Sequence, residues 1–296
     1  MLPDLTPVTD VLIWVVMGGF LAGIAADRRG RSAARSITAA AWVGFALFWL
    51  LMVPFFVFEH RSIVEAILAG IAVPACVYVA HRLHGGRDSL LVLSRAVGVM
   101  GLIYLPFGAI PAFHDTLIEV VADQTYAGLQ LLGSTPAFET DEAGLRNTFA
   151  FTLDSGREYS TRIVFACTGI GSMAIFGGLI AAVRAPIERR LAALAIAVST
   201  IWVLNIARNV FIAYSIGHQL FDQAALAGPV MWLFGVEDPI RVSFFVADRI
   251  LSQGLAVFAL LAIAWAVVKV LPELYVIVED LAFLVTGEEH DLGRGR

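Results

Sequence analysis

Phe165-Ala-Cys-Thr-Gly-Ile-Gly-Ser172 marks the point where a polar stretch of the chain becomes a long apolar run. Cys167 is therefore expected at a membrane surface. Two arginines, Arg208 and Arg249, stand inside later apolar runs at a similar expected depth. A guanidinium inside a membrane is costly and is rarely kept without a role. One thiol and two permanent cations at the same membrane face predict a catalytic site.

The composition is that of an integral membrane protein. Hydrophobic residues make up 59% of the chain and charged residues 15%, whereas soluble domains are about 45–50% apolar and about 25% charged. Seven stretches approach or exceed the roughly 20 apolar residues that a transmembrane helix needs. These stretches are 9–26, 38–57, 62–81, 89–112, 163–183, 189–215 and 242–268.

The connections between these stretches indicate the orientation of the chain. Most of the 20 basic residues follow the first, third and fifth stretches or lie in the C-terminal tail, and such connections are usually cytoplasmic. We therefore expect an all-α polytopic membrane protein with its N-terminus outside and its C-terminus in the cytoplasm. Residues 1–268 would form the membrane domain and 269–296 an amphipathic cytoplasmic tail. The outer connection 216–241 is too short and interrupted for a span and predicts a re-entrant or interfacial cap on the outer surface.

The longest outer connection, 113–162, is expected to be folded. Apolar and acidic residues recur with a helical period over 114–132, which predicts an amphipathic helix with its apolar face in the membrane interface. Residues 147–153 alternate between apolar and polar, a turn follows at Asp154-Ser-Gly-Arg157, and 158–163 continues the pattern. This pattern predicts a small β-hairpin that leads directly into the cysteine segment.

Counting along the apolar runs places the three candidate residues at one level. Cys167 would lie about four residues inside its helix, and Arg208 and Arg249 about seven residues from the outer ends of theirs, all within roughly 10 Å of the outer interface. A thiol beside a guanidinium favours the nucleophilic thiolate. Arginine stays protonated, so its roles would be electrostatic: stabilising the thiolate and the oxyanion of an acyl-transfer transition state.

Each of these residues also has a simpler interpretation. A cysteine at the start of a helix is often only packed, and an arginine near the end of a span often extends to the headgroups. Because Asp248 is next to Arg249, an ordinary ion pair also remains a possible interpretation of this arginine. Asn205 and Asn209, which flank Arg208, could support the site or could form interhelical hydrogen bonds.

The acyl-transfer hypothesis leaves the source of a proton for the leaving amine open. Tyr214, His218, Asp248 and water are candidates that the sequence does not rank. We predict no metal site, no cofactor and no nucleic-acid partner.

Three segments together resemble the exosortase/archaeosortase family. They are Phe165-Ala-Cys-Thr-Gly-Ile170, Leu204-Asn-Ile-Ala-Arg-Asn209 and Asp248-Arg249 within the last span. The resemblance covers the seven-span core and is strongest over about 160–255. The first two motifs in successive spans are specific together, although each is weak by itself.

The resemblance implies roles for three residues. The invariant cysteine of the family corresponds to Cys167 and its first arginine to Arg208. The third position is histidine in bacterial exosortases and arginine in the archaeal branch, so Arg249 favours the archaeal branch and argues against a Cys–His proton relay. Asn205, Asn209 and Asp248 are not implied by the family and are candidates through proximity alone.

The function that the resemblance implies is that of a cysteine transpeptidase in the cell membrane, with its active site at the extracytoplasmic face. Its substrates would carry a C-terminal tripartite signal, made of a Pro-Gly-Phe motif, a hydrophobic helix and a basic tail, as on an S-layer glycoprotein. The reaction would form a thioester on Cys167 and transfer the product to a membrane lipid. Two alternatives stay open: a membrane protease that releases a free acid, and a non-enzymatic transporter or lipid-binding protein that uses the arginines. No oligomeric state is predicted.

Overall fold

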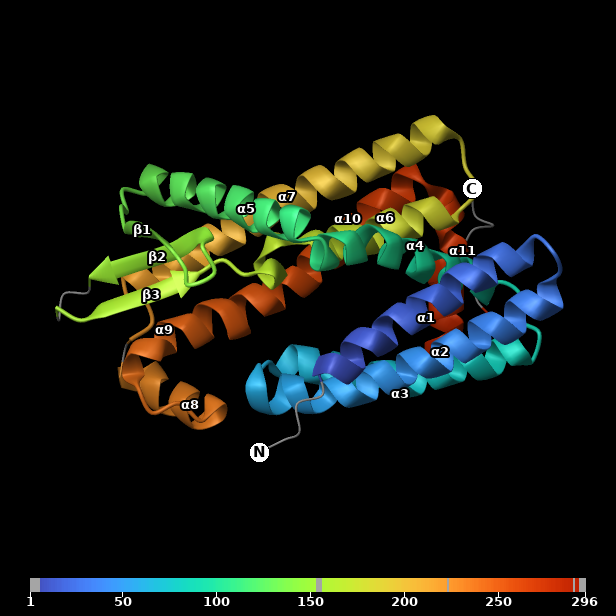
Figure 1. The fold of residues 1–296 in the computed structure, drawn as a ribbon, viewed down its shortest axis with the longest axis horizontal. Helices are drawn as coiled ribbons and strands as arrows, with labels where there is room; N and C mark the ends of the chain where they lie inside the picture. The colour runs from blue at the N-terminus through green and yellow to red at the C-terminus, as the bar shows by residue number, and fades with distance from the viewer. Residues whose placement is uncertain (1–5, 153–155, 223, 290, 293–296) are drawn as a thin grey trace. The chain divides into compact units, whose positions relative to one another are not determined.

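The computed structural model describes residues 6–152, 156–222, 224–289 and 291–292, which are mostly helical with one small sheet (Figure 1). The chain forms two compact units. The first comprises Met1–Ile103, Ala174–Ala195 and Trp265–Arg296, and the second comprises Tyr104–Met173 and Ile196–Ala264.

Six helical segments in the described residues are long and apolar enough to cross a membrane. They are Val8–Asp27, Arg31–Glu59, Ile63–His84, Leu90–Ala109, Ile187–Gly217 and Pro239–Val270. These segments correspond to six of the seven predicted spans. The remaining stretch, 163–183, contains a shorter apolar helix, Ile170–Ala182, which is about 20 Å long at 1.5 Å per residue. The orientation of the two termini stays a prediction.

The first unit is a helical assembly built from the N-terminal helices and parts of later ones. Its elements are α1 (Thr6–Asp27), α2 (Arg31–Pro54), the π-helical η1 (Phe55–Glu59), α3 (Ile63–His84), η5 (Pro272–Leu274), α11 (Tyr275–Thr286) and parts of α4 (Leu90–Ala109), α6 (Ile170–Ala182), α7 (Ile187–Gly217) and α10 (Gln253–Val270). α2 packs between α1 and α3 (Figure 1). Phe20 and Trp42 meet edge to face with ring centroids 5.2 Å apart, and the Trp42 indole N–H donates to the Ser94 hydroxyl at 2.8 Å.

Ion pairs hold the connections of this unit. Arg31 and Arg35 both bind Asp88, at 2.9 and 2.5 Å, and these hydrogen bonds lower the pKa of Asp88 to about 2. The predicted amphipathic tail forms α11, in which the buried Asp280 accepts hydrogen bonds from Arg87 and the Ser89 hydroxyl, at 2.9 and 2.8 Å. This carboxylate ties α11 to the connection between α3 and α4. The end of the tail, 293–296, lies outside the described residues.

The second unit carries the sheet and the candidate site. Its elements are α5 (Pro111–Leu131), β1 (Ala137–Thr140), β2 (Arg146–Thr152), β3 (Glu158–Arg162), the 3₁₀ turn η2 (Phe165–Thr168), α8 (Ala224–Phe234), η3 (Pro239–Arg241), α9 (Val242–Phe244), the π-helical η4 (Phe245–Ser252) and the remaining parts of α4, α6, α7 and α10. The predicted surface cap contains α8, a short helix in which Trp232 is 85% exposed.

The predicted hairpin is present and has a third strand. The sheet is antiparallel in the order β1-β2-β3, with Phe149 opposite Thr161. Asp154 and Ser155, which were part of the predicted turn, lie outside the described residues. Asn147 joins the sheet to the segment that follows, because its amide donates to the Asp141 carboxylate at 2.9 Å and to the Ile163 carbonyl at 3.1 Å.

The predicted outer helix is α5, but the prediction that its apolar face lies in the membrane interface is wrong. Ile118, Val121 and Leu129 are buried in one core together with Phe149 of β2 and Ala213 of α7. An amphipathic sequence pattern is the same whether the apolar face of the helix meets lipid or a protein core. Here β2 and α7 cover the apolar face of α5.

We expect Gly178→Ala to destabilise the protein. A Cβ at Gly178 would collide with the Ala96 carbonyl oxygen and lie 2.9 Å from the Met100 nitrogen, both backbone atoms of α4. Overpacking of this kind costs about 1–3 kcal/mol, and the melting temperature of the detergent-solubilised protein should fall. Gly70 in α3 is the matched control, because no atom lies within 4 Å of the Cβ position. Equal melting temperatures for Gly178→Ala and Gly70→Ala would contradict the close α4–α6 packing.

Candidate active site

Cys167 lies in the 3₁₀ turn η2 and not inside an α-helix, so the predicted position four residues into a helix is wrong. Gly169 follows with φ 77°, a left-handed conformation that favours glycine, and α6 begins only at Ile170. The Cys167 N–H donates to the Val164 carbonyl at 2.8 Å. The reversal at Gly169 separates the thiol-bearing turn from the apolar helix and accounts for the short length of α6.

Two asparagines hold this turn. Asn205 and Asn209 lie one helical turn apart on the same face of α7, and the amide nitrogen of each donates to the Cys167 carbonyl oxygen, at 2.7 and 2.9 Å. In a continuous α-helix this carbonyl would accept a backbone N–H, so the two amides replace that partner. A Cβ at Gly169 would lie 3.0 Å from Asn205. The glycine and the asparagines therefore clamp Cys167 against α7.

One carboxylate bridges the two predicted arginines. Arg208 on α7 places its Nη2 2.5 Å from Oδ1 of Asp248. Arg249 places its Nε 3.5 Å from Oδ2 of the same residue. Asp248 and Arg249 are consecutive residues of the π-helical η4, and such wide turns occur frequently at functional sites. The side chains of Asp248 and Arg249 are only 9% and 11% exposed, whereas that of Arg208 is 26% exposed.

The ion pairing leaves a net positive charge beside the thiol. Arginine does not lose its proton, so two guanidiniums and one ionised carboxylate sum to a single positive charge. All three groups interact electrostatically with the Cys167 thiol. A thiolate would make the set of four groups neutral, and buried charges are tolerated when they are balanced in this way. The two guanidiniums favour the thiolate of Cys167, whereas the burial of the thiol and the Asp248 carboxylate oppose it.

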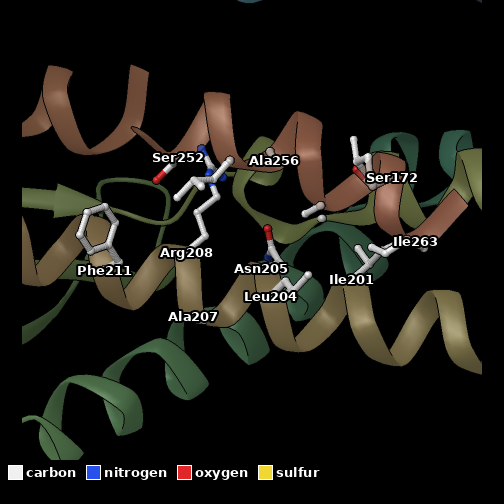
Figure 2. A pocket seen from close by; sticks show the side chains of 14 residues that line it. Ser172, Ile201, Leu204, Asn205, Ala207, Arg208, Phe211, Ser252, Ala256 and Ile263 are labelled. Atoms are coloured by element: carbon white, nitrogen blue, oxygen red, sulfur yellow. The ribbon is translucent and has the colours of Figure 1, made fainter. Parts of the chain in front are cut away.

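A cavity of about 310 Å³ is lined by Arg208 of this cluster and by Gly169 and Asn205 of the clamp. Its walls are the start of α6, one face of α7, Ser252 and α10. Figure 2 shows Arg208 and Asn205 extending from α7 toward this space, with Ile201 and Ile263 farther along it. Most of the remaining lining is apolar. The cavity thus combines the guanidinium of Arg208 with a surface that suits an apolar helix or chain.

The structure separates the predicted proton donors. Asp248 is at the guanidiniums, as described above. His218 packs against the Tyr214 ring with centroids 4.2 Å apart, and its Nε2 is 3.3 Å from the Ser134 hydroxyl. His218 lines a second cavity and not the one beside Arg208.

Two ring contacts of the cysteine turn, with His114 and with Tyr104, were not predicted. Phe165, in the same turn as Cys167, stacks on His114 with ring centroids 5.0 Å apart and contacts Tyr104 at 5.5 Å. The His114 Nδ1 is 2.8 Å from the Asp115 carboxylate. The sequence contains no signal for this neighbourhood, because all of these contacts to Phe165 come from segments far away in the chain. Among the described residues, no group of three His, Cys, Asp or Glu side chains could hold a metal ion.

The fold and the site define a multi-pass membrane protein with a clamped thiol at a cationic cluster. Residues 9–237 match the transmembrane exosortases, and the chain belongs to that family, as the motifs predicted. Over 285 residues it is 52% identical to archaeosortase A of Natronomonas pharaonis, which covers 94% of this chain and 90% of the relative. Over 294 residues it is 48% identical to archaeosortase A of Haloferax volcanii, covering 96% of both. No solved structure matches the chain.

The charge arrangement predicts how fast Cys167 is alkylated. In a Cys76→Ala background, Arg208→Gln should slow iodoacetamide labelling of Cys167 at neutral pH by about tenfold, since an adjacent cation favours the thiolate. Asp248→Asn should accelerate labelling, because it removes the negative charge beside the thiol. The readout is the labelled fraction over time by intact mass. Arg184→Gln, at an exposed position, serves as the control. Slower labelling of Asp248→Asn would contradict the charge balance described here.

Proposed function

We propose that this protein is a membrane-embedded cysteine transpeptidase that cleaves the C-terminal tripartite sorting signal of surface proteins such as an S-layer glycoprotein. The observation that supports it most is the clamped Cys167 turn beside two guanidiniums bridged by Asp248. The names of the two relatives, both archaeosortase A, agree with this class of enzyme. The reaction takes place at the extracytoplasmic face of the cell membrane.

In the first step, the Cys167 thiolate attacks the carbonyl carbon of the scissile peptide bond, and the carbonyl oxygen becomes an oxyanion. N–H groups of Arg208 and Arg249 donate hydrogen bonds to this oxyanion, while Asp248 keeps both guanidiniums oriented. Collapse of the intermediate breaks the carbon–nitrogen bond. The leaving amine takes up a proton and departs with the C-terminal helix, and a thioester stays on Cys167.

In the second step, an amine or hydroxyl group of a membrane lipid attacks the thioester. The carbon–sulfur bond breaks, Cys167 returns to the thiolate, and the acceptor releases a proton. One proton is taken up in the first step and one is released in the second, so the cycle balances. The product is a surface protein anchored to a lipid.

The apolar cavity suits the hydrophobic part of the sorting signal. It is lined by residues of α6, α7 and α10, and Arg208 is one of them. A substrate helix that packs along this surface would bring the motif before it to the level of Cys167. A lipid headgroup can reach the same level, which is the geometric requirement for transfer.

Loss of the nucleophile gives the first test. Cys167→Ala should abolish processing of a co-expressed tripartite-signal substrate, whereas Cys76→Ala, a buried cysteine of α3, should retain it. Arg208→Lys should reduce processing by about 10²-fold or more, because an ammonium cannot reproduce the planar fork that binds a carboxylate and an oxyanion. Intact mass of the product reports the outcome. Processing by Cys167→Ala would contradict the proposal and favour the arginine-based transporter.

The mass of the product also distinguishes transfer from hydrolysis. A lipid adduct supports the transpeptidase. A free C-terminal acid would instead identify water as the acceptor and make the protein a protease.

The asparagine clamp gives a separate test of positioning. Asn205→Ala and Asn209→Ala should each lower kcat several-fold, because both amides act through the Cys167 carbonyl. For Asn209→Ala, whose side chain does not line the substrate cavity, KM should change little. Since both amides donate to one oxygen, the second substitution should lower kcat by a larger factor than the first. Kinetics of single and double variants measure this. A rise in KM alone would contradict a positioning role.

A further inference from the structure

A second cavity, of about 960 Å³, lies in the same unit as the candidate active site and has no role in the proposed chemistry. Its walls are residues 133–137, the C-terminal end of β2 at 150–152, Gly217 at the end of α7 with the turn that follows, and 239–240. Its size is at the upper end of the range of about 300–1,000 Å³ for ligand pockets. Polar side chains from several elements face it: Ser134, Thr135, Thr152, Arg157, His218 and Asp222.

The walls of this cavity are held in place by specific contacts. Arg157 pairs with Asp238 at 2.8 Å, and this bond lowers the pKa of the Asp238 carboxyl. Gln219 has φ 46°, a costly conformation for a residue other than glycine, and its side chain donates to the Ile216 carbonyl at 2.8 Å. Strained residues of this kind cluster at ligand-binding and active sites.

The cavity also presents protein backbone suited to an extended chain. The sheet order β1-β2-β3 makes β1 an edge strand, and the turn that leads into it, together with Ala137 at its start, lines the cavity. Edge strands bind extended peptides through main-chain hydrogen bonds, while adjacent pockets accept side chains. Hydroxyl groups of Thr135 and Thr152 add further hydrogen-bonding positions.

Helix α7 sets the distance between the active site and this cavity. Arg208 and Gly217, the last residue of α7, are nine residues apart, which corresponds to about 14 Å at 1.5 Å per residue, and His218 and Gln219 follow in the turn after the helix. An extended polypeptide covers about 3.3–3.6 Å per residue. Four to five residues of extended chain would therefore connect a carbonyl at Cys167 with the cavity.

The path from Arg208 to Gly217 along α7 is also the direction in which the substrate chain leaves the active site. An open-edged sheet does not occur in the hydrocarbon region, so the end of α7 beside β2 emerges from the membrane. Phe151 of β2 lies against Gly217, where a side chain would collide with its ring. The part of a substrate that precedes the cleaved bond leaves the membrane on that same side.

We propose that this cavity binds the polypeptide segment that precedes the sorting motif, in extended form, at about four to five residues before the cleaved bond. The inference rests on the proposed function and adds a recognition site for the surface protein itself. The hydrophobic helix of the signal would then bind at the apolar cavity, and the exported chain that precedes the motif would bind at this second cavity.

The test compares two synthetic substrates in the full-length, membrane-reconstituted protein. One has eight residues before the motif and the other has two. The wild type should process the long substrate with about tenfold higher kcat/KM, the equivalent of about 1.4 kcal/mol. Thr152→Trp and Thr135→Trp, which fill the cavity from exposed positions, should remove this advantage by raising KM for the long substrate. Both should process the short substrate like the wild type.

Thr140→Trp is the matched control, since Thr140 is an exposed threonine of β1 that does not line the cavity. It should behave like the wild type on both substrates. Equal processing of long and short substrates by the wild type, or equal effects of Thr152→Trp and Thr140→Trp, would overturn the inference. Failure of the proposed function looks different: neither substrate would depend on Cys167.

A crosslinking measurement covers the case in which the tryptophan variants do not fold. A benzophenone side chain introduced at position 152 should crosslink to the long substrate four to five residues before the cleaved bond, and the same group at position 140 should not. Equal crosslinking at the two positions would also overturn the inference, as would crosslinking confined to the glycans of a glycosylated substrate.

Discussion

The site depends on one carboxylate shared by two guanidiniums. Arg208 and Arg249 come from different helices, and both approach Asp248. Charges in a low-dielectric interior are expensive unless they are paired, and removing one partner of a buried pair typically costs about 3–5 kcal/mol. Asp248 therefore joins α7 to η4 and at the same time leaves one positive charge in excess. That excess is what an anionic sulfur or oxyanion needs.

A second constraint acts on the backbone of the cysteine. Cys167, the proposed nucleophile, does not lie within a regular helix but in a short turn, and Asn205 and Asn209 hold its carbonyl. Gly169 allows both the left-handed conformation and the close approach of Asn205. The three polar residues of the Asn-x-x-Arg-Asn motif thus perform two tasks from one helix: the asparagines position the thiol, and the arginine supplies charge.

The sheet and α5 of the second unit also support this arrangement. α5 and β2 share a core with α7, and Asn147 bonds the Ile163 carbonyl just before the cysteine turn. These contacts fix the sheet to α7 and to the segment that leads into the cysteine turn. The same helix carries the clamp, the arginine and, farther along, the wall of the polar cavity, so chemistry and recognition of the exported chain would be fixed at a set spacing.

The sequence by itself determined the apolar runs, the two arginines within them, the outer helix and the hairpin, because hydropathy and periodicity are properties of contiguous residues. The motifs also identified the family and placed Cys167, Arg208 and Arg249 together as candidates. Only the tertiary structure decided the turn at Cys167, the sharing of Asp248 and the packing of the apolar face of α5 on a sheet. These features depend on contacts between segments that are distant in the chain. Side-chain amides of α7 bind the Cys167 carbonyl in place of a helical N–H group, and the sheet covers the apolar face of α5 that lipid could otherwise cover.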